Sequence, residues 1–298
     1  MPSVSSLDEA AAALRAATSA GRTVRIGADL DASGMDRLLE HEAGDLTCTV
    51  EAGIRLSALA AALAPFGQRL SLDPPADPSV GACLAANLSG PLRHRFGAPR
   101  DLVLGVTLVL ADGTVVNAGG KVVKNVAGYD LGKLVCGSRG RLAFIGRVSL
   151  RLHPSPAAAA TVVVDSDDSA AIVAVLLASQ LAPSAFDVLH PGRVALLFEG
   201  GAGAVAAQVE AAQALVGGRE ADASVWDESR SRQAAAQGRS SFAPGSLRDF
   251  LERVPEAVVR PAAGSAYLPD PMANETPEPV RLLQERVRAR FDPKGVLA

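Results

Sequence analysis

Apolar residues recur at helical spacing in two early segments of the chain. Residues 7–18 are rich in alanine and amphipathic, and Ser6 and Glu9 stand where a capping box begins a helix. A second run with helical character, over residues 54–66, stops at Gly67, a residue type that commonly ends helices. The pattern therefore predicts two helices on either side of the first β-prone region.

Apolar runs of strand length fill most of the remaining first half. Residues 102–110 and 114–117 flank an Asp-Gly pair, which is a strong hairpin signal. Further strands are predicted over residues 23–26, 46–51, 68–72 and 142–152, with a helical turn over residues 35–41. Residues 73–97 are irregular and rich in proline and glycine, which predicts an ordered functional loop that contains a short helix.

Pro154 and Pro156 predict a domain boundary, and the second half shows a different order of strands and helices. The order strand, helix, strand, strand, helix predicts a small antiparallel sheet with helices on one face. The segments concerned are residues 161–164, 169–181, 186–189, 194–198 and 204–216, followed by a polar helix within 220–239, a strand within 258–268 and a charged amphipathic helix over 277–290.

Composition and charge exclude several function classes. The chain has 298 residues, a net charge of −3 and no basic block, so nucleic acid is not an expected partner. Its three cysteines are isolated, and its four histidines lack metal-ligand spacing, so we expect no metal or iron–sulfur site. Residues 1–20 do not resemble a signal peptide, and no apolar run is long enough to span a bilayer. We expect a cytoplasmic protein that contacts the inner membrane only through partners.

Glycines gather between two β-prone runs in residues 119–154. Such a backbone turns sharply and approaches other groups closely, which suits a large flat ligand held by main-chain groups. Gly and Ser at Ser79-Val80-Gly81 and Gly137-Ser138 leave N–H donors accessible to a pyrophosphate. Taken alone, these residues are also compatible with a loop-rich β domain that contains tight turns.

Three segments in order, residues 72–90, 96–116 and 119–154, resemble the FAD domain of the vanillyl-alcohol oxidase / PCMH flavoprotein superfamily. The string GGKVVKNVAGYDLGKLVCGSRGRL is most similar to the FAD-binding E-type subunits of glycolate oxidases. The resemblance implies an α+β fold with three parts. These are a PCMH-type FAD-binding domain of two α+β subdomains (1–154), a smaller α+β cap or substrate domain (155–270), and a C-terminal helix that returns to the FAD domain (271–298).

The same resemblance implies which residues border the cofactor FAD. Their backbone or apolar side chains would line the flavin, the ribityl chain and the adenosine diphosphate, and Lys124 would add positive charge. The implied residues are Pro74, Pro75, Ser79, Val80, Gly81, Ala85, Asn87, Lys124, Asn125, Val126, Ala127, Gly128, Tyr129, Gly137, Ser138, Gly140, Leu142 and Ile145.

One loop departs from the family pattern. Relatives hold the pyrophosphate on a glycine-rich turn, but residues 26–36 are short and contain Asp29 and Asp31 beside Gly27. Carboxylates repel a pyrophosphate unless they point to solvent. The place where a histidine often attaches the flavin covalently is also missing, so noncovalent binding is expected.

The resemblance implies an FAD-binding subunit of a glycolate oxidase or dehydrogenase complex. It would oxidise a 2-hydroxy acid such as glycolate through flavin or relay its electrons, with a larger FAD subunit and an iron–sulfur subunit as partners. Two alternatives are a stand-alone FAD oxidoreductase acting on another hydroxy acid, sugar or alcohol, and a flavin-poor assembly subunit. Arg193, Arg260 and Tyr267 suit substrate binding by residue type alone, so no catalytic residue is assigned.

Two further patterns each allow a second interpretation. Gly201, Gly203 and Ala206, with Glu220 downstream, resemble a dinucleotide-binding fingerprint, but the context favours a simple strand-to-helix turn. His94 lies in a basic stretch, PLRHRFGAPRD, which either faces an anionic cofactor or substrate or makes surface salt bridges.

Overall fold

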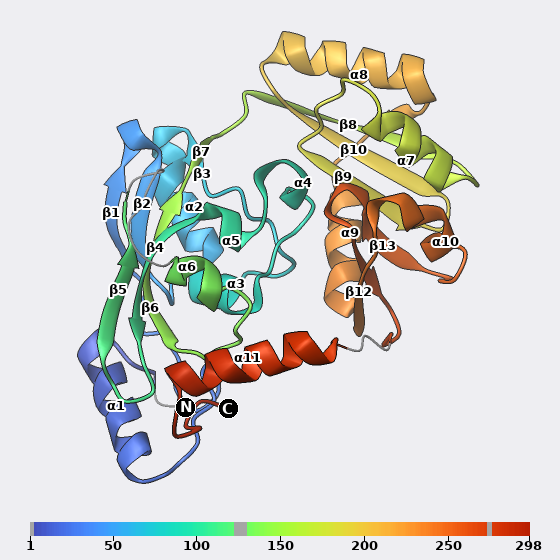
Figure 1. The fold of residues 1–298 in the computed structure, drawn as a ribbon. Coiled ribbons are helices and arrows are strands. Elements are labelled where there is room, and N and C mark those ends of the chain that lie inside the picture. Colours follow the sequence, from blue (N-terminus) through green and yellow to red (C-terminus); the bar gives the residue numbers. More distant parts are fainter. Residues whose placement is uncertain (1–2, 122–129, 273–275) are drawn as a thin grey trace.

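The computed structural model describes residues 3–121, 130–272 and 276–298. Its strands form two large antiparallel sheets, which lie on opposite sides of Figure 1. The first sheet has the order β1 (Leu38–Glu42), β2 (Thr47–Glu51), β6 (Phe144–Arg151), β4 (Val103–Val109) and β5 (Val115–Gly119). The second has the order β11 (Arg219–Ala221), β8 (Ala158–Asp165), β10 (Arg193–Gly200), β9 (Ala185–His190), β13 (Ala257–Arg260), β14 (Ser265–Leu268) and β12 (Gly238–Ser241).

Helices pack on the sheets and connect successive strands along the chain. We call the part of the chain built around the first sheet the first unit and the part built around the second sheet the second unit. A two-stranded sheet of β3 (Gln68–Arg69) and β7 (His153–Pro154) belongs to the first unit. The helices are α1 (Leu7–Ser19), α2 (Leu56–Leu63), α3 (Val80–Ala86), α4 (Arg93–Phe96), α5 (Pro99–Leu102), α6 (Leu131–Val135), α7 (Ser169–Leu177), α8 (Ala202–Val216), α9 (Ser224–Ala235), α10 (Leu247–Leu251) and α11 (Glu278–Phe291).

The first sheet packs one face against α2, α3 and α6. Val50, Val148 and Leu150 from the strands meet Leu59 and Leu84 from the helices in one core. The opposite face carries polar cross-strand pairs, because alternate residues of a strand point to opposite sides of its sheet. A hydrogen bond of 2.9 Å between Thr49 and Ser149 is an example.

The N-terminal segment matches the sequence prediction in α1 but not in the residues that follow. Ser6 caps α1, whereas the Glu9 carboxylate accepts from the Ser5 N–H rather than from that of Ser6. The strand predicted over residues 23–26 is reduced to isolated bridges. The helical turn predicted over residues 35–41 is wrong, because residues from Leu38 onward pair with β2 as the strand β1.

The second sheet carries helices on both faces, which corrects the expectation of one covered face. α7, α8 and α10 pack on the side of Val162 and Leu196. α9 packs on the other side, where Trp226 contacts Val163 and its Nε1 donates to the Thr161 hydroxyl at 3.0 Å. The side covered by α9 is also the side that turns toward the first unit in Figure 1.

The dinucleotide-binding fingerprint near Gly201 does not have the required topology. β10 leads into α8, but it pairs antiparallel with both β8 and β9. Glu220 lies in β11, which is antiparallel to β8. A dinucleotide site of this type requires parallel strands joined by the helix, so Gly201 simply begins α8.

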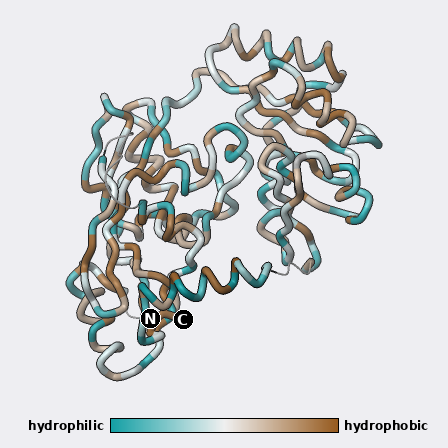
Figure 2. Tube along the Cα trace, in the orientation of Figure 1, coloured by the Kyte–Doolittle hydropathy of each residue, from teal (hydrophilic) through white to brown (hydrophobic). Residues whose placement is uncertain are grey.

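The chain returns to the first unit through α11, which leads from the second unit to the first in Figure 1. Hydrophobic and hydrophilic residues alternate along this helix in Figure 2. Its later turns place Val287 and Phe291 against the first core. The Asp292 carboxylate then accepts from the N–H groups of Val296 and Leu297, and Leu297 bridges to Val24 near the start of the chain. No helix in the described part of the chain is long and apolar enough to cross a bilayer.

A buried polar cluster joins the two units, and we call it the junction cluster: Ser89, Asp187, Gln233, Arg260 and Tyr267. The Arg260 side chain is 1% exposed. It donates to the Ser89 carbonyl at 3.2 Å, to the Gln233 amide oxygen at 2.5 Å and to the Tyr267 hydroxyl at 3.0 Å. Gln233 also donates to the Ser89 carbonyl at 2.9 Å, so one backbone carbonyl of the first unit receives two donors from the second.

Replacing Thr161 with valine should lower the free energy of unfolding by about 1–3 kcal/mol, because the buried indole N–H of Trp226 then has no acceptor. The chain contains a single tryptophan, so urea unfolding followed by its fluorescence measures the change. Thr107→Val is the matched control, since its hydroxyl bonds an exposed partner, Asn117. Equal losses in the two variants would contradict the assignment.

Asp73 should make stability depend on pH. Burial raises the pKa of Asp73 to about 7, against the opposing charges of Arg260 and Arg230. Between about pH 4 and pH 7 the folded state therefore binds a proton that the unfolded chain releases, so the free energy of unfolding falls as pH rises through this window. Asp73→Asn keeps an acceptor for the Leu92 N–H and should flatten the fall by up to ~1.4 kcal/mol per pH unit.

Urea midpoints measured across this window test the assignment. Asp29→Asn is the control, because Arg25 lowers the pKa of Asp29 to about 2 and its titration lies below the window. Identical pH slopes in the wild type and Asp73→Asn would show that Asp73 is not the titrating group.

Candidate functional site

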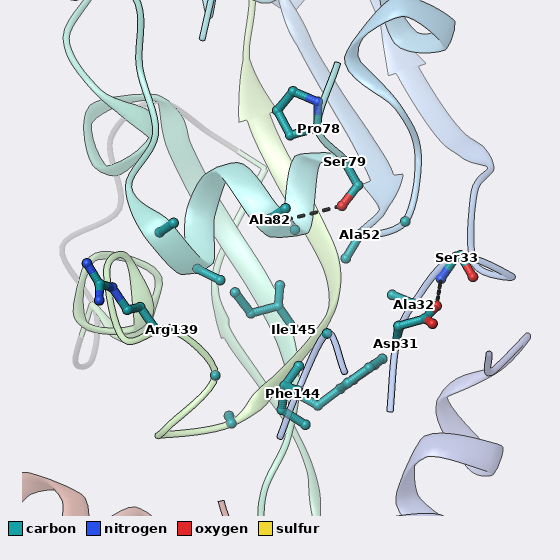
Figure 3. Close-up of a pocket in the computed structure, with 18 of the residues that line it drawn as sticks. Asp31, Ala32, Ser33, Ala52, Pro78, Ser79, Ala82, Arg139, Phe144 and Ile145 are labelled. Atoms are coloured by element: carbon teal, nitrogen blue, oxygen red, sulfur yellow. Dashed lines mark hydrogen bonds between the residues drawn. The ribbon is translucent and has the colours of Figure 1, made fainter. Parts of the chain in front are cut away.

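A cavity of about 560 Å³ opens in the first unit between four backbone segments. Figure 3 shows it between α3, the end of β2, the loop around Asp31 and the start of β6. Its size lies in the range of pockets that bind cofactors. Its lining is mostly small and apolar, with Ala52, Ala82, Phe144 and Ile145 on its walls.

The start of α3 forms one wall because it docks closely on the end of β2. Ser79 caps the helix by accepting from the Ala82 N–H at 3.2 Å. The Val80 N–H donates to the Ile54 carbonyl at 2.9 Å, and the Gly81 N–H donates to the Ala52 carbonyl at 2.7 Å. The amides of Val80 and Gly81, predicted as pyrophosphate donors, are therefore engaged within the protein.

Two glycines make this close approach possible. A Cβ at Gly81 would lie 2.9 Å from the carbonyl oxygen of Ala52. A Cβ at Gly53 would lie 1.9 Å from the carbonyl oxygen of Ala32, and real Cβ atoms do not approach oxygen that closely. The loop that carries Ala32 thus lies directly on the end of β2, and the two segments form the floor of the cavity.

The turn of residues 137–141 forms a second wall. The N–H of Gly137 donates to the Leu84 carbonyl at 2.9 Å, and that of Arg139 donates to the Ala85 carbonyl at 2.7 Å. Gly140 has a φ of +77°, and a Cβ there would lie 2.7 Å from Cβ of Ile26. The glycine-containing turn is therefore pinned to the end of α3 and packed on the opposite loop.

The two aspartates of the short loop have different environments. Asp29 forms an ion pair of 2.9 Å with Arg25, both side chains are exposed, and Asp29 does not line the cavity. Asp31 does line the cavity and accepts from the Ser33 N–H at 2.8 Å. The hydroxyl and N–H of Ser33 lower the pKa of Asp31, so it is charged at neutral pH. Only one of the two carboxylates therefore faces a ligand in this cavity.

Two arginines add positive charge to the lining. Arg55 donates to the Asp77 carbonyl at 2.6 Å, which fixes its guanidinium near the start of α2. Arg139 projects from the pinned turn. Figure 3 places Arg139 and Asp31 at opposite ends of the cavity, with Ile145 and Phe144 between them. The charged lining residues in the described part of the chain are thus two cations and one anion.

The structure brings some of the predicted cofactor residues together at this cavity. Those that line it are Ser79, Gly81, Ala85, Gly140 and Ile145. The side chains of Val80 and Leu142 instead belong to the first core. Pro74 and Pro75 line a separate cavity of about 270 Å³ against α9.

Three predicted residues lie beside the cavity, and six are not described. Gly137 forms the pinned turn, and Asn87 ends α3 with a φ of +49°. The Asn87 side-chain oxygen and the Ser138 hydroxyl are buried and have no partner among the described residues. The remaining six predicted residues, Lys124, Asn125, Val126, Ala127, Gly128 and Tyr129, lie outside the described residues.

Sequence reasoning missed lining residues from four segments. They are Ile26, Ala32, Ser33, Ala52, Gly53, Arg55, Pro78, Ala82, Ala86, Arg139, Ala143 and Phe144. Arg139 lies inside the GSRG string that pointed to the cofactor, so its position in the motif was a usable signal. Gly53 carried no such signal, because its role depends on a long-range contact.

The residues present fit a dinucleotide cofactor. The cavity has apolar walls for a ring system, cations for phosphates, and an open approach at Gly27, whose Cβ position has no neighbour within 4 Å. The unpartnered polar atoms of Asn87 and Ser138 are further potential contacts. Among the described residues, no cluster of histidine, cysteine, aspartate or glutamate is arranged to hold a metal ion.

Comparison with known proteins gives a domain match and a shared fold. Residues 3–119 match the family model described as an FAD binding domain. The fold is shared with alkyldihydroxyacetonephosphate synthase, with a TM-score of 0.73 at 15% identity over 99% of this chain and 74% of that one. Residues 3–119 thus resemble an FAD binding domain, and the chain as a whole has the PCMH-type fold.

Among named relatives, glycolate oxidase subunit GlcE of Escherichia coli (strain K12) is 32% identical over 218 residues, which is 72% of this chain and 61% of that protein. The mitochondrial D-lactate dehydrogenase [cytochrome] of Arabidopsis thaliana is 37% identical over 130 residues, 44% of this chain and 23% of that protein. The chain thus spans less than two thirds of these curated relatives. The shared fold confirms the predicted α+β PCMH-type fold, and the match to an FAD binding domain confirms the predicted cofactor FAD.

Gly53→Ala should reduce FAD binding and stability together, because its Cβ pushes the Ala32 loop away from β2. We expect at least a tenfold weaker FAD affinity, measured by recovery of flavin fluorescence on dilution. Gly203→Ala in α8 is the control, since that Cβ meets nothing within 4 Å and alanine favours helix. Unchanged flavin content in Gly53→Ala would contradict the role of this contact.

Proposed function

We propose that the chain is the FAD-binding subunit of a glycolate oxidase or dehydrogenase type of complex, oxidising a 2-hydroxy acid or relaying its electrons. The named relatives support this class of reaction: one is a glycolate oxidase subunit and another a D-lactate dehydrogenase. Within this chain, the proposal rests on a set of cations on the face of the second sheet that is turned toward the first unit.

That face is defined by strand register. Tyr267 pairs with Arg239 on β12 and with Val258 on β13, so these three side chains share one side of the second sheet. Arg260 lies two residues beyond Val258 and therefore on the same side. The guanidinium carbons of Arg239 and Arg260 lie 5.6 Å and 4.9 Å from the centre of the Tyr267 ring. The tyrosine is thus flanked by two cations.

A third cation approaches from the first unit. Arg93 on α4 donates to the Ser89 hydroxyl at 3.2 Å, beside the Ser89 carbonyl that binds Arg260. Burial lowers the pKa of Arg93, and the nearby charges of Arg239 and Arg260 lower it further. Three guanidiniums thus surround one tyrosine, and the Asp187 carboxylate lies 3.4 Å from Arg260 alone. Arg93 and Arg239 are therefore the cations that we propose for an anionic substrate.

The three substrate-binding candidates chosen by residue type lie at two different places in the structure. Arg260 and Tyr267 meet in the junction cluster, whereas Arg193 forms ion pairs with Glu228 at 2.9 Å and Asp165 at 3.4 Å elsewhere on the second unit. The arginines of the basic stretch around His94 form no ion pair with the described residues, so the structure does not support the interpretation as surface salt bridges. Arg93 joins the cationic set, and the His94 ring packs edge-on against Phe186 with centroids 5.6 Å apart.

These residues suit a 2-hydroxy acid in distinct ways. Arg93 and Arg239 would bind the substrate carboxylate, for which a guanidinium supplies paired donors. The Tyr267 hydroxyl accepts from Arg260, which orients it and leaves its own proton free to donate to a substrate oxygen. FAD, when bound, supplies the electron acceptor for the oxidation of the alcohol to a 2-oxo acid.

Partners and attachment remain part of the proposal. The relative named as a glycolate oxidase subunit supports assembly into a multi-subunit complex, and we propose a larger FAD subunit and an iron–sulfur subunit as neighbours. We also propose noncovalent FAD, because the cavity lining contains no histidine among the described residues. Electron transfer to the partners would connect the site to the inner membrane.

Purification of the chain with and without its partners tests the function. We expect a yellow protein whose flavin is released into the supernatant on denaturation and whose flavin band is bleached by glycolate in the complex. Arg93→Met should raise KM for glycolate about tenfold or more with little change in flavin content, because it removes one carboxylate contact. Arg100→Met, at an exposed position that follows α4, is the control.

Three outcomes would change the conclusion. A colourless chain that does not take up FAD supports the assembly-subunit alternative. Dye-linked turnover by the single chain supports a stand-alone oxidoreductase. Flavin that stays on the precipitate after denaturation contradicts noncovalent binding.

A further inference from the structure

Arg139 is an exposed cation on the rim of the candidate FAD cavity (Figure 3). Its side chain makes no hydrogen bond or ion pair with any residue that the structure describes. The other arginine of the lining, Arg55, is held by the Asp77 carbonyl. Among the described residues, Arg139 is therefore the lining cation whose guanidinium has no protein partner.

The backbone at Arg139 is unusual for an arginine. Its φ is +54°, in the left-handed region that favours glycine, and its neighbours Gly137 and Gly140 also have positive φ values. The N–H of Arg139 donates to the Ala85 carbonyl at 2.7 Å, so the strained conformation is fixed from the end of α3. Glycine would fit this position with less strain, and the backbone of the turn therefore gives no reason for an arginine.

Three consecutive N–H groups of this turn are not available to phosphates. The N–H groups of Gly137, Ser138 and Arg139 donate to the carbonyls of Leu84, Val135 and Ala85. On the opposite loop, Asp31 faces the cavity. A diphosphate in this cavity consequently meets few backbone donors and one unfavourable charge, and it needs a side-chain cation.

We propose that the Arg139 guanidinium binds the diphosphate of the adenosine-diphosphate half of FAD and offsets the charge of Asp31. The proposal rests on the proposed flavin function of this cavity. A guanidinium offers paired donors that match phosphate oxygens, and Figure 3 places Arg139 at the end of the cavity away from Asp31. Because the site is open to solvent, the contribution is moderate and is screened by salt.

Three variants separate charge from backbone strain. Arg139→Gly removes the cation and relieves the left-handed strain, Arg139→Lys keeps a charge, and Arg141→Ala removes an exposed arginine from the same turn that does not line the cavity. The flavin-free form of each full chain is titrated with FAD and, separately, with ADP by calorimetry at low and high salt. Melting temperatures of the flavin-free forms are recorded in parallel.

We expect Arg139→Gly to weaken binding of both FAD and ADP about five- to tenfold at low salt, and less at high salt. Its flavin-free form should melt at the same temperature as the wild type or higher, so the loss cannot come from misfolding. Arg139→Lys should retain most of the affinity. Arg141→Ala should bind like the wild type.

The remaining outcomes overturn the proposal. Equal binding by Arg139→Gly and the wild type removes the assigned contact. Equal losses in Arg139→Gly and Arg141→Ala indicate a nonspecific charge effect, and a loss for FAD but not for ADP places the contact outside the adenosine-diphosphate half. A wild-type chain that binds neither ligand refutes the flavin function itself. A wild type and Arg139→Gly that bind FAD equally well refute only the Arg139 contact.

Discussion

The cavity exists because two backbone segments touch at positions where no side chain could fit. The Gly81 N–H donates to the Ala52 carbonyl, and Gly53 lies against the Ala32 carbonyl. These contacts set the start of α3, the end of β2 and the short acidic loop in one fixed arrangement. Any Cβ at Gly53 would need to displace backbone, which cannot yield as the end of a flexible side chain can. The cofactor site therefore depends on main-chain packing more than on any polar side chain.

Local patterns predicted the elements well where neighbouring residues alone decide the structure. The helix capped by Ser6, the Asp-Gly hairpin between β4 and β5, and the helix end at Gly67 all follow from sequence neighbours. The prediction for residues 35–41 was wrong, because pairing with β2 overrode a weak helical pattern. The position of α9 on the opposite sheet face was also missed, since the Trp226 contact that fixes it is long-range.

The residues of the candidate site also divide into those marked by the local sequence and those that depend on long-range contacts. Ser79, Gly81 and Gly140 were predicted, because glycine and small residues stand out in a sequence and belong to a family string. Gly53 was not predicted, because its neighbour Ala32 is distant in the chain and nothing local marks the contact. The engagement of the Gly81 amide by Ala52 was equally hidden. A sequence shows which backbone groups are unshielded by side chains, but not which of them already have partners.

Charge therefore carries more of the ligand recognition than the glycine content suggested. Several turn amides are used internally, so in our proposal the cavity relies on the arginines of its lining, while Arg260 lies at the centre of the junction cluster. The two roles differ in physical character. Arg260 is nearly fully buried, so its bonds to Ser89 and Tyr267 are strong and leave it no freedom to follow a ligand. Arg239 is exposed and Arg93 is half-buried, so both are more accessible to a ligand than Arg260. In the proposed site, the buried cation would position the tyrosine and the more accessible arginines would bind the anion, so that the sheet face that joins the two units would also receive the substrate.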